Sequence, residues 1–104
     1  MDEGTPTLAG TVAATPEGWR FEGSLTMENA AVMIAAADAL PLPESGRVDL
    51  AGLTHADSAA LAVLMALRRR AAAEGRALRV ENLPPALTSL ALVYGVDDLA
   101  RGTA

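Results

Sequence analysis

Apolar and polar residues alternate in two short segments near the start of the chain. Residues 7–13 alternate weakly and predict an edge strand. Residues 19–23 alternate the apolar Trp19 and Phe21 with the charged Arg20 and Glu22, which is typical of a half-buried strand. The intervening Thr15-Pro16-Glu17-Gly18 is a turn sequence. We therefore expect these two segments to form a β-hairpin.

The next segment changes from a strand period to a helical period. Thr26 is a candidate N-cap, and the spacing predicts a helix from there to about Leu40. Pro41 and Pro43 then end this helix. The residues expected to face the core are Ala30, Met33, Ile34, Ala37 and Leu40.

The second half of the chain alternates strands with helices. Residues 47–53 predict an interior strand, residues 59–73 a helix that ends at a left-handed Gly75, and residues 77–83 a further strand. Pro84 suits the first turn of a third helix, which runs to about Tyr94 before Gly95. The order β-β-α-β-α-β-α predicts an α/β fold with a small mixed sheet, because alternating strands and helices favour parallel neighbours.

Length and composition narrow the class of protein. The 104 residues fit one domain, which we place at residues 7–99, with a flexible N-terminus at 1–6 and a short tail at 100–104. The net charge of −5 argues against nucleic acid or an anionic membrane as the main partner. Without cysteine the chain has no thiol chemistry. Because it lacks a signal-like start and a run of roughly 20 apolar residues, we expect a cytoplasmic protein without membrane insertion.

The stretch from Arg47 to Leu61 is the most informative part of the sequence. It passes from a strand, through a short polar turn, into a helix whose entrance carries Asp57 and Ser58. A serine there can cap free backbone N–H groups, or carry a phosphate that those groups and the helix dipole accommodate. The pattern therefore indicates a docking point or a switch.

The sequence offers few residues that could form a catalytic site or a metal site. His55 is the only histidine. A triad with Asp57 and Ser58 would need three side chains in contact, whereas residues on one tight turn diverge. A loop histidine exposed to solvent is the favoured interpretation. One histidine and scattered carboxylates are too few for a typical metal site, and the chain has no phosphate-binding glycine loop. We expect no cofactor, no metal and no enzymatic activity.

The helix at 59–73 carries more apolar surface than one stripe requires. Leu61 and Met65 widen its main stripe, which is expected to face the core. The residues of that stripe are Ala60, Val63, Leu64, Leu67 and Ala71. The excess could contact the third helix or could form a partner surface, on which methionine is favoured for its adaptability. Arg68–Arg70 would complement the C-terminal helix dipole and form a solvated face.

The element order, the strand sequence Val48-Asp49-Leu50 and the helix entrance Asp57-Ser58-Ala59-Ala60-Leu61 together resemble the STAS domain. The resemblance covers about residues 7–99 and places the strand acid of that family on Asp49. It places the phosphorylatable hydroxyl on Ser58, and Ala60 stands where the family usually has glycine. The segments around 73–84 and 90–99 are similar to MlaB-like STAS subunits of phospholipid-transport ABC complexes, which end in a comparable helix and short tail.

The resemblance implies a non-enzymatic subunit that binds and stabilises or activates the ATPase of an Mla-type ABC complex. That complex includes a permease and maintains outer-membrane lipid asymmetry, which would place the chain at the inner membrane through its complex. The expected contact residues are Thr54, His55, Asp57, Ser58, Ala59, Leu61, Met65 and Tyr94. One alternative is an anti-anti-sigma factor that binds an anti-sigma kinase and is phosphorylated on Ser58. A small hydrolase using Ser58 is a further alternative, which the absence of a nucleophile elbow disfavours.

Overall fold

The computed structural model describes residues 10–96 and contains the predicted order of elements, β-β-α-β-α-β-α. The segments 1–6 and 100–104 and the first part of the predicted strand 7–13 lie outside the described residues. The elements are β1 (Gly10–Thr15), β2 (Gly18–Leu25), α1 (Ala30–Asp38), β3 (Arg47–Ala56), α2 (Ser58–Ala73), β4 (Arg79–Glu81) and α3 (Pro85–Val93).

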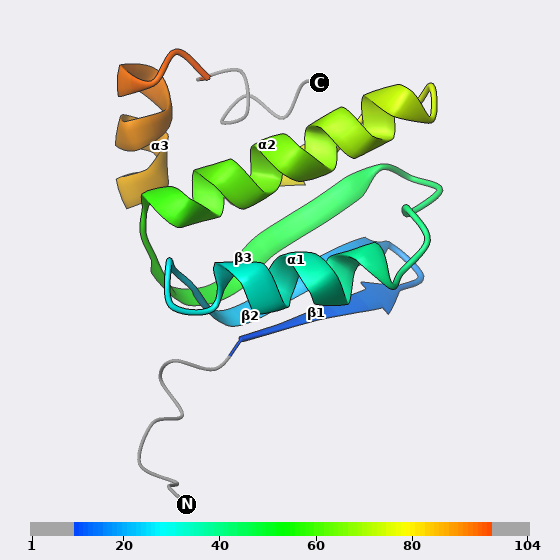
Figure 1. Ribbon diagram of the computed structural model, residues 1–104, viewed down its shortest axis with the longest axis horizontal. Coiled ribbons are helices and arrows are strands. Elements are labelled where there is room, and N and C mark those ends of the chain that lie inside the picture. The colour runs from blue at the N-terminus through cyan, green and yellow to red at the C-terminus, as the bar shows by residue number, and fades with distance from the viewer. Residues whose placement is uncertain (1–9, 97–104) are drawn as a thin grey trace, which may run out of the picture.

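The strands form one mixed sheet in the order β1-β2-β3-β4 (Figure 1). The first two strands are the predicted antiparallel hairpin, while β2, β3 and β4 run parallel to one another. The register aligns Trp19 with Val48 and Val48 with Val80, so one apolar row crosses the three parallel strands. The expectation of a small mixed sheet is confirmed.

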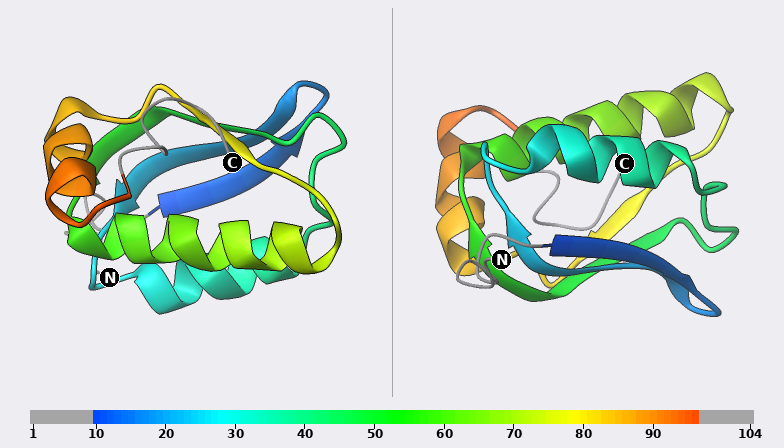
Figure 2. Two further views of the ribbon diagram at one scale, coloured as in Figure 1. Left: turned by 90° about the horizontal axis from the view of Figure 1, so that it is seen from above. Right: turned by 60° about the horizontal axis from the view of Figure 1, so that its bottom comes forward.

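The helices α1 and α2 cover one face of the sheet, and α3 lies at one end beside the start of α2 (Figures 1 and 2). The core between these layers consists mainly of aliphatic side chains, as the composition requires, with Trp19 and Phe21 from β2. The predicted inward face of α1 is confirmed, since Met33 and Ala37 are buried. On the same helix and just after it, Ala30, Ile34 and Leu40 pack against the core.

The start of the first helix differs from the prediction. Thr26 does not cap α1, which begins at Ala30 and ends at Asp38. Instead the backbone carbonyl of Thr26 accepts a hydrogen bond from the Asn29 N–H, and its hydroxyl accepts one from the Glu28 N–H. A turn therefore precedes the helix, because the Thr26 side chain satisfies a donor of that turn and not of the helix.

The boundaries of two strands also differ from the prediction, because pairing with the neighbouring strands sets where each strand ends. The strand predicted at 47–53 extends to Ala56, since β2 continues to pair with it as far as Leu25. The strand predicted at 77–83 is reduced to Arg79–Glu81, the residues that pair with β3. The left-handed end of α2 is as predicted, with Gly75 at φ 71°.

The prediction that residues 68–70 form a solvated face is wrong for Arg70. Arg70 is partly buried and donates to the carbonyl oxygens of Ala37 (3.1 Å) and Leu40 (2.7 Å) at the end of α1. Its guanidinium also lies 5.8 Å from the centre of the Trp19 ring. This side chain therefore ties α2 to the open carbonyls of α1, which a guanidinium with several donors is suited to do.

Candidate interaction site

Four segments meet at one end of the domain. They are the end of β3, the start of α2, the loop between β2 and α1, and α3 (Figures 1 and 2). All the residues singled out in the sequence as contact residues come from β3, α2 and the end of α3, or from Asp57 between the first two.

The predicted polar turn before α2 is part of the sheet. Thr54 and His55 lie within β3, and His55 pairs with Ser24 of β2. Both are exposed, as expected for His55, although that residue is on a strand and not on a loop. The chain reverses direction only at Asp57, because the strand pairing continues to Ala56.

Asp57, and not Ser58, is the N-cap of α2. Its backbone is extended (φ −135°, ψ −167°), and one carboxylate oxygen accepts the N–H of Ala59 at 2.8 Å. This extended backbone and short side-chain bond are typical of an N-cap. Of the two roles considered for Ser58, helix capping is wrong, since Ser58 is the first helical residue.

The second carboxylate oxygen of Asp57 reaches across to another loop. It accepts the backbone N–H of Met27 at 3.2 Å, and the Asp57 N–H donates to the carbonyl of Leu25 at 3.4 Å. One side chain therefore joins the start of α2 to the β2–α1 loop. Sequence reasoning missed this role, because the two positions are 30 residues apart.

Ser58 is exposed, and its hydroxyl makes no hydrogen bond with any residue in the described part of the chain. Ala59 is half-buried and contributes the backbone N–H that Asp57 caps. The Ser58 hydroxyl is therefore available for a partner or for modification, and helix capping does not occupy it.

The arrangement of His55 does not form a catalytic triad. Its Nδ1 lies 3.1 Å from the hydroxyl of Thr54, which also donates to the carbonyl of Gly23. Asp57 uses both carboxylate oxygens for backbone N–H groups and does not orient the imidazole. A nucleophile, a base and an orienting acid in mutual contact, which such catalysis requires, are not assembled by these side chains.

A groove runs between the first half of α2 and the end of α3. Its cavity volume is about 330 Å³, and its lining is mainly apolar. The lining residues are Ser58, Leu61, Ala62, Met65, Tyr94 and Val96. The α2 residues follow the i, i+3, i+4, i+7 spacing of one helix face, so Ser58 and Tyr94 border the same groove.

The two apolar residues that widen the stripe of α2 differ in burial. Leu61 is only 3% exposed and belongs to the core, which agrees with the alternative that the additional apolar surface packs within the domain. Met65 is half-buried and packs against the core from its edge. Leu64 and Leu67 are buried, as predicted. The burial of Leu61 follows from the position of α3, which covers the side of α2 that a sheet alone would leave open.

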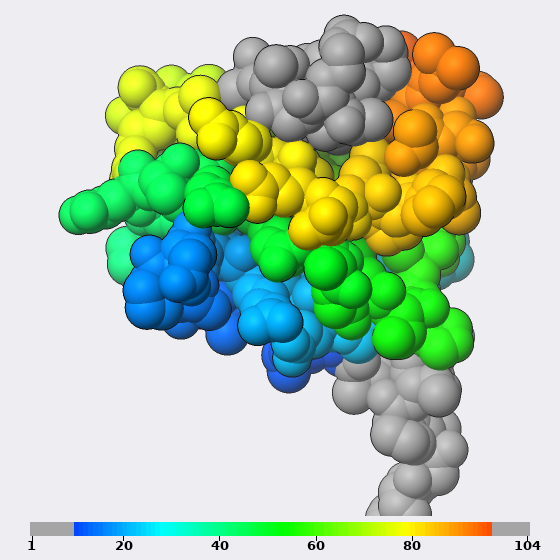
Figure 3. All heavy atoms as spheres, turned by 180° about the vertical axis from the view of Figure 1, so that it is seen from behind, coloured from blue at the N-terminus to red at the C-terminus, as the bar shows by residue number. Residues whose placement is uncertain are grey.

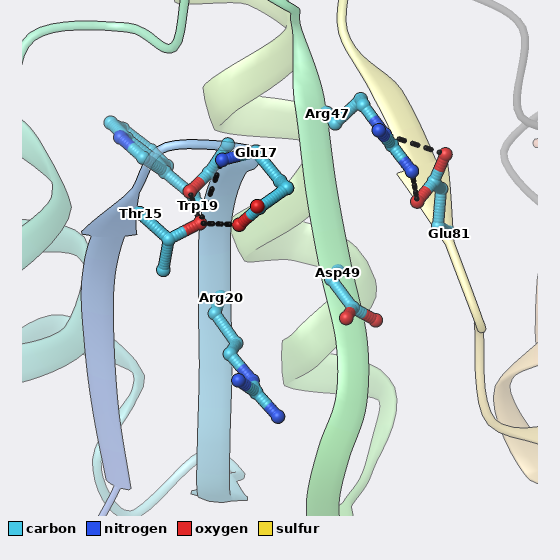
Figure 4. Close-up of a pocket in the computed structure, with 8 residues that line it drawn as sticks. Thr15, Glu17, Trp19, Arg20, Arg47, Asp49 and Glu81 are labelled. Carbon is cyan, nitrogen blue, oxygen red and sulfur yellow. Dashed lines mark hydrogen bonds and ion pairs between the residues drawn. The ribbon is translucent and has the colours of Figure 1, made fainter.

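A second hollow, of about 300 Å³, lies near the β1–β2 turn and is shown in Figure 4. Among the residues described, no helix covers this face of the sheet (Figure 2). Arg20, Asp49 and Glu81 occupy one row across β2, β3 and β4. Arg47 donates to both carboxylate oxygens of Glu81 at 3.1 and 3.2 Å. Charged side chains on a face without a helix, such as the paired Arg47 and Glu81, are typical of a solvated sheet face.

Asp49, the strand acid of the resemblance, is held by two hydrogen bonds on one oxygen. The Asn82 side chain and the Ala51 backbone N–H each donate to it at 2.9 Å. The Asn82 hydrogen bond, followed by that of Ala51, lowers the pKa of Asp49 below its ordinary value. Asn82 has φ 60°, a left-handed conformation that asparagine tolerates. Asp49 therefore fixes the turn after β4, which leads to α3.

Seen from behind, the segment with β4 crosses the molecule from the end of α2 to α3 (Figure 3). In residues 10–96, no helix is long and apolar enough to cross a membrane. The same residues contain no group of three or more histidine and acidic side chains that could hold a metal ion.

Comparison with known proteins identifies the family. No curated protein matches the chain at a significant level. The sequence model of the MlaB STAS domain matches residues 18–101, which include three of the four strands and all three helices. STAS domains are generally non-enzymatic interaction modules. With its mixed sheet, its helix order and this match over most of its length, the chain belongs to the MlaB-type STAS domain family.

Proposed function

We propose that this chain is a non-enzymatic subunit that binds the ATPase of a phospholipid-transport ABC complex and stabilises or activates it. The observation that supports this best is the apolar groove beside the exposed Ser58, in a domain of the MlaB type. In this proposal the chain reaches the inner membrane through its complex with the ATPase and a permease, and the complex maintains outer-membrane lipid asymmetry.

The chemistry of the groove suits a protein partner. Tyr94 is 60% exposed, and the preceding Leu92 and Val93 are also exposed. Interfaces concentrate their binding energy in a few aromatic and aliphatic anchors that partner atoms surround. An exposed tyrosine beside an apolar groove supplies such an anchor, and Met65 at the groove edge can adapt its shape to a partner.

Ser58 adds a polar contact at the groove. Because its hydroxyl is not used for capping, a partner can donate to it or accept from it without breaking a bond within the domain. A hydrogen bond of this kind fixes the orientation of an apolar contact, and the capped start of α2 holds the serine in place. Thr54, His55 and Ala59 then belong to the rim of the proposed contact.

Binding at this site would act on the ATPase through differential affinity. If the chain favours one conformation of the ATPase, that conformation must bind the chain more tightly, because coupling between binding and conformation is reciprocal. The proposed effect is therefore a change in ATP hydrolysis that saturates with the concentration of the chain.

The exposed Ser58 also favours a second candidate, an anti-anti-sigma factor that binds an anti-sigma kinase and is phosphorylated on this serine. A phosphate on Ser58 would lie next to the Asp57 carboxylate and would change the local charge sharply. The two candidates share the site and differ in the partner.

Co-purification with the ABC-transporter ATPase of the same organism tests the proposal. We expect a stable complex with the wild-type chain and loss of that complex with Tyr94→Asp, which changes an exposed side chain and leaves the core intact. Thr11→Asp, an exposed position on β1, is the matched control and keeps the complex. A wild-type chain that binds and is phosphorylated by an anti-sigma kinase, and does not bind the ATPase, would support the second candidate instead.

A further inference from the structure

The loop between β2 and α1 presents the most exposed large apolar side chain of the described residues. Met27 is 77% exposed, whereas the buried Leu25, two residues earlier, belongs to the core. The loop lies beside the start of α2, to which the bond between the Met27 N–H and Asp57 fixes it. Met27 is therefore held next to Asp57, whose neighbour Ser58 lines the groove.

This loop is well ordered by hydrogen bonds. The backbone N–H groups of all four residues 26–29 have partners. Thr26 donates to the Asn29 side chain at 2.9 Å, and Asn29 donates back to the Thr26 carbonyl at 3.1 Å. The Asn29 amide also donates to the carbonyl of Ser24 at 2.9 Å. The backbone that carries Met27 is therefore fixed before any partner binds.

The ordered backbone of this loop affects the free energy of binding to a partner. An apolar side chain on a mobile loop loses conformational entropy when a partner immobilises it, which reduces the affinity. Here the loop backbone is already held, and methionine is a flexible, polarisable side chain that adapts to irregular surfaces. The exposed side chain gains no packing energy within the folded domain, so a partner that covers it gains contact area without the cost of ordering the loop backbone.

Charge is distributed unevenly over the domain. The first residues of the parallel strands carry Arg20, Arg47 and Arg79, and Arg68–Arg70 and Arg76 lie in or just after the second half of α2. Because β2, β3 and β4 are parallel, these arginines gather away from the start of α2. The segments 26–29 and 85–96 and the start of α2 carry no arginine, whereas Glu28 and Asp57 lie there.

We infer that Met27 and Glu28 extend the proposed docking surface across Asp57, and that the ATPase face covering it is apolar with a basic rim. This inference rests on the proposed function and adds the loop before α1 as a second contact region. Asp57 is the positioning residue, because its carboxylate holds both the Met27 backbone and the start of α2.

The test measures the affinity of the purified ATPase for full-length variants by isothermal titration calorimetry. Met27→Asp should weaken binding at least tenfold, since it places a charge in a covered apolar contact. Met27→Leu keeps an apolar side chain of similar volume and should bind within about threefold of wild type. Ala14→Asp adds the same charge at an exposed site on β1 and should bind as wild type does.

Glu28 tests the charge of the partner. Glu28→Lys should weaken binding more at low salt than at high salt, because exposed charges are screened as the ionic strength rises. Tighter binding of Glu28→Lys at low salt would overturn the assignment of a basic rim.

The results also separate this inference from the proposed function. If wild type binds, Tyr94→Asp does not, and Met27→Asp binds as wild type does, the inference is overturned and the proposed function stands. If the wild-type chain does not bind the ATPase, the proposed function fails. Since Met27 is exposed, thermal melting of Met27→Asp should match wild type, which distinguishes lost contact from lost folding.

Discussion

Replacing Asp57 by alanine should destabilise the domain more than replacing its neighbour Ser58. Asp57→Ala removes the cap on Ala59 and the bond to the backbone of Met27. Loss of an N-cap costs about 1 kcal/mol. Loss of the second hydrogen bond costs about another 1 kcal/mol. We therefore expect the free energy of unfolding to fall by about 2 kcal/mol.

The assay is thermal and urea unfolding followed by circular dichroism. For a domain of this size, a loss of about 2 kcal/mol lowers the Tm by roughly 10 °C. The slope of the urea transition should stay the same, because the variant changes stability and not the surface exposed on unfolding. Asp57→Asn, which keeps an oxygen acceptor, should fall between wild type and Asp57→Ala.

Ser58→Ala is the matched control for this prediction. Its hydroxyl has no partner among the described residues, so its loss should change the free energy of unfolding by less than about 0.5 kcal/mol. The reasoning is refuted if Ser58→Ala is as destabilising as Asp57→Ala, or if Asp57→Ala unfolds at the wild-type temperature. The first result would mean that Ser58 caps α2, and the second that neither residue does.

Three further predictions concern the rest of the domain. Asn82→Ala should raise the pKa of Asp49 toward its ordinary value, measured by carboxyl carbon NMR. A carboxyl group whose pKa is lowered by folding stabilises the fold at pH values above its pKa in the unfolded chain, about 3.9, and this stability is lost as the pH falls through the folded pKa. Wild type should therefore lose more stability than the variant on acidification. An unchanged Asp49 pKa in the variant would contradict this. Arg70→Met should lower the free energy of unfolding by about 2 kcal/mol through loss of two charged hydrogen bonds, and wild-type stability in urea would refute the tie between α2 and α1. Leu61→Asp should prevent folding, since a charge at this buried position costs several kcal/mol, and a native circular dichroism spectrum would show that Leu61 is not core.

The sequence was sufficient for the element order and most of the core. Alternation around Trp19 and Phe21 predicted β2, and the helical spacing of Met33 and Ala37 predicted the inner face of α1. These signals are local, because a strand repeats every two residues and a helix every 3.6. The structure departed from prediction where contacts distant in sequence decide, as at the end of β3, which β2 extends to Ala56.

The same distinction applies to the candidate site. Asp57 and Ser58 are both good N-cap residues, so the sequence alone could not decide which one has the extended backbone that a cap requires. The burial of Leu61 depends on where α3 packs, and the bond between Asp57 and Met27 joins two separate loops. Neither the burial of Leu61 nor the bond between Asp57 and Met27 produces a periodic pattern in the sequence. Ser58 and Tyr94 were both selected from the sequence, but only the fold brings them to one groove.

Hydrogen exchange of the complex between this chain and the ATPase tests the central claim most directly. Backbone amides in residues 26–29, in the first turns of α2 and in residues 85–96 should exchange more slowly in the complex than in the free chain. The strands around Arg47 and Glu81 on the uncovered sheet face should exchange at the same rate in both. Slower exchange on that sheet face, with no change at the start of α2, would contradict the account.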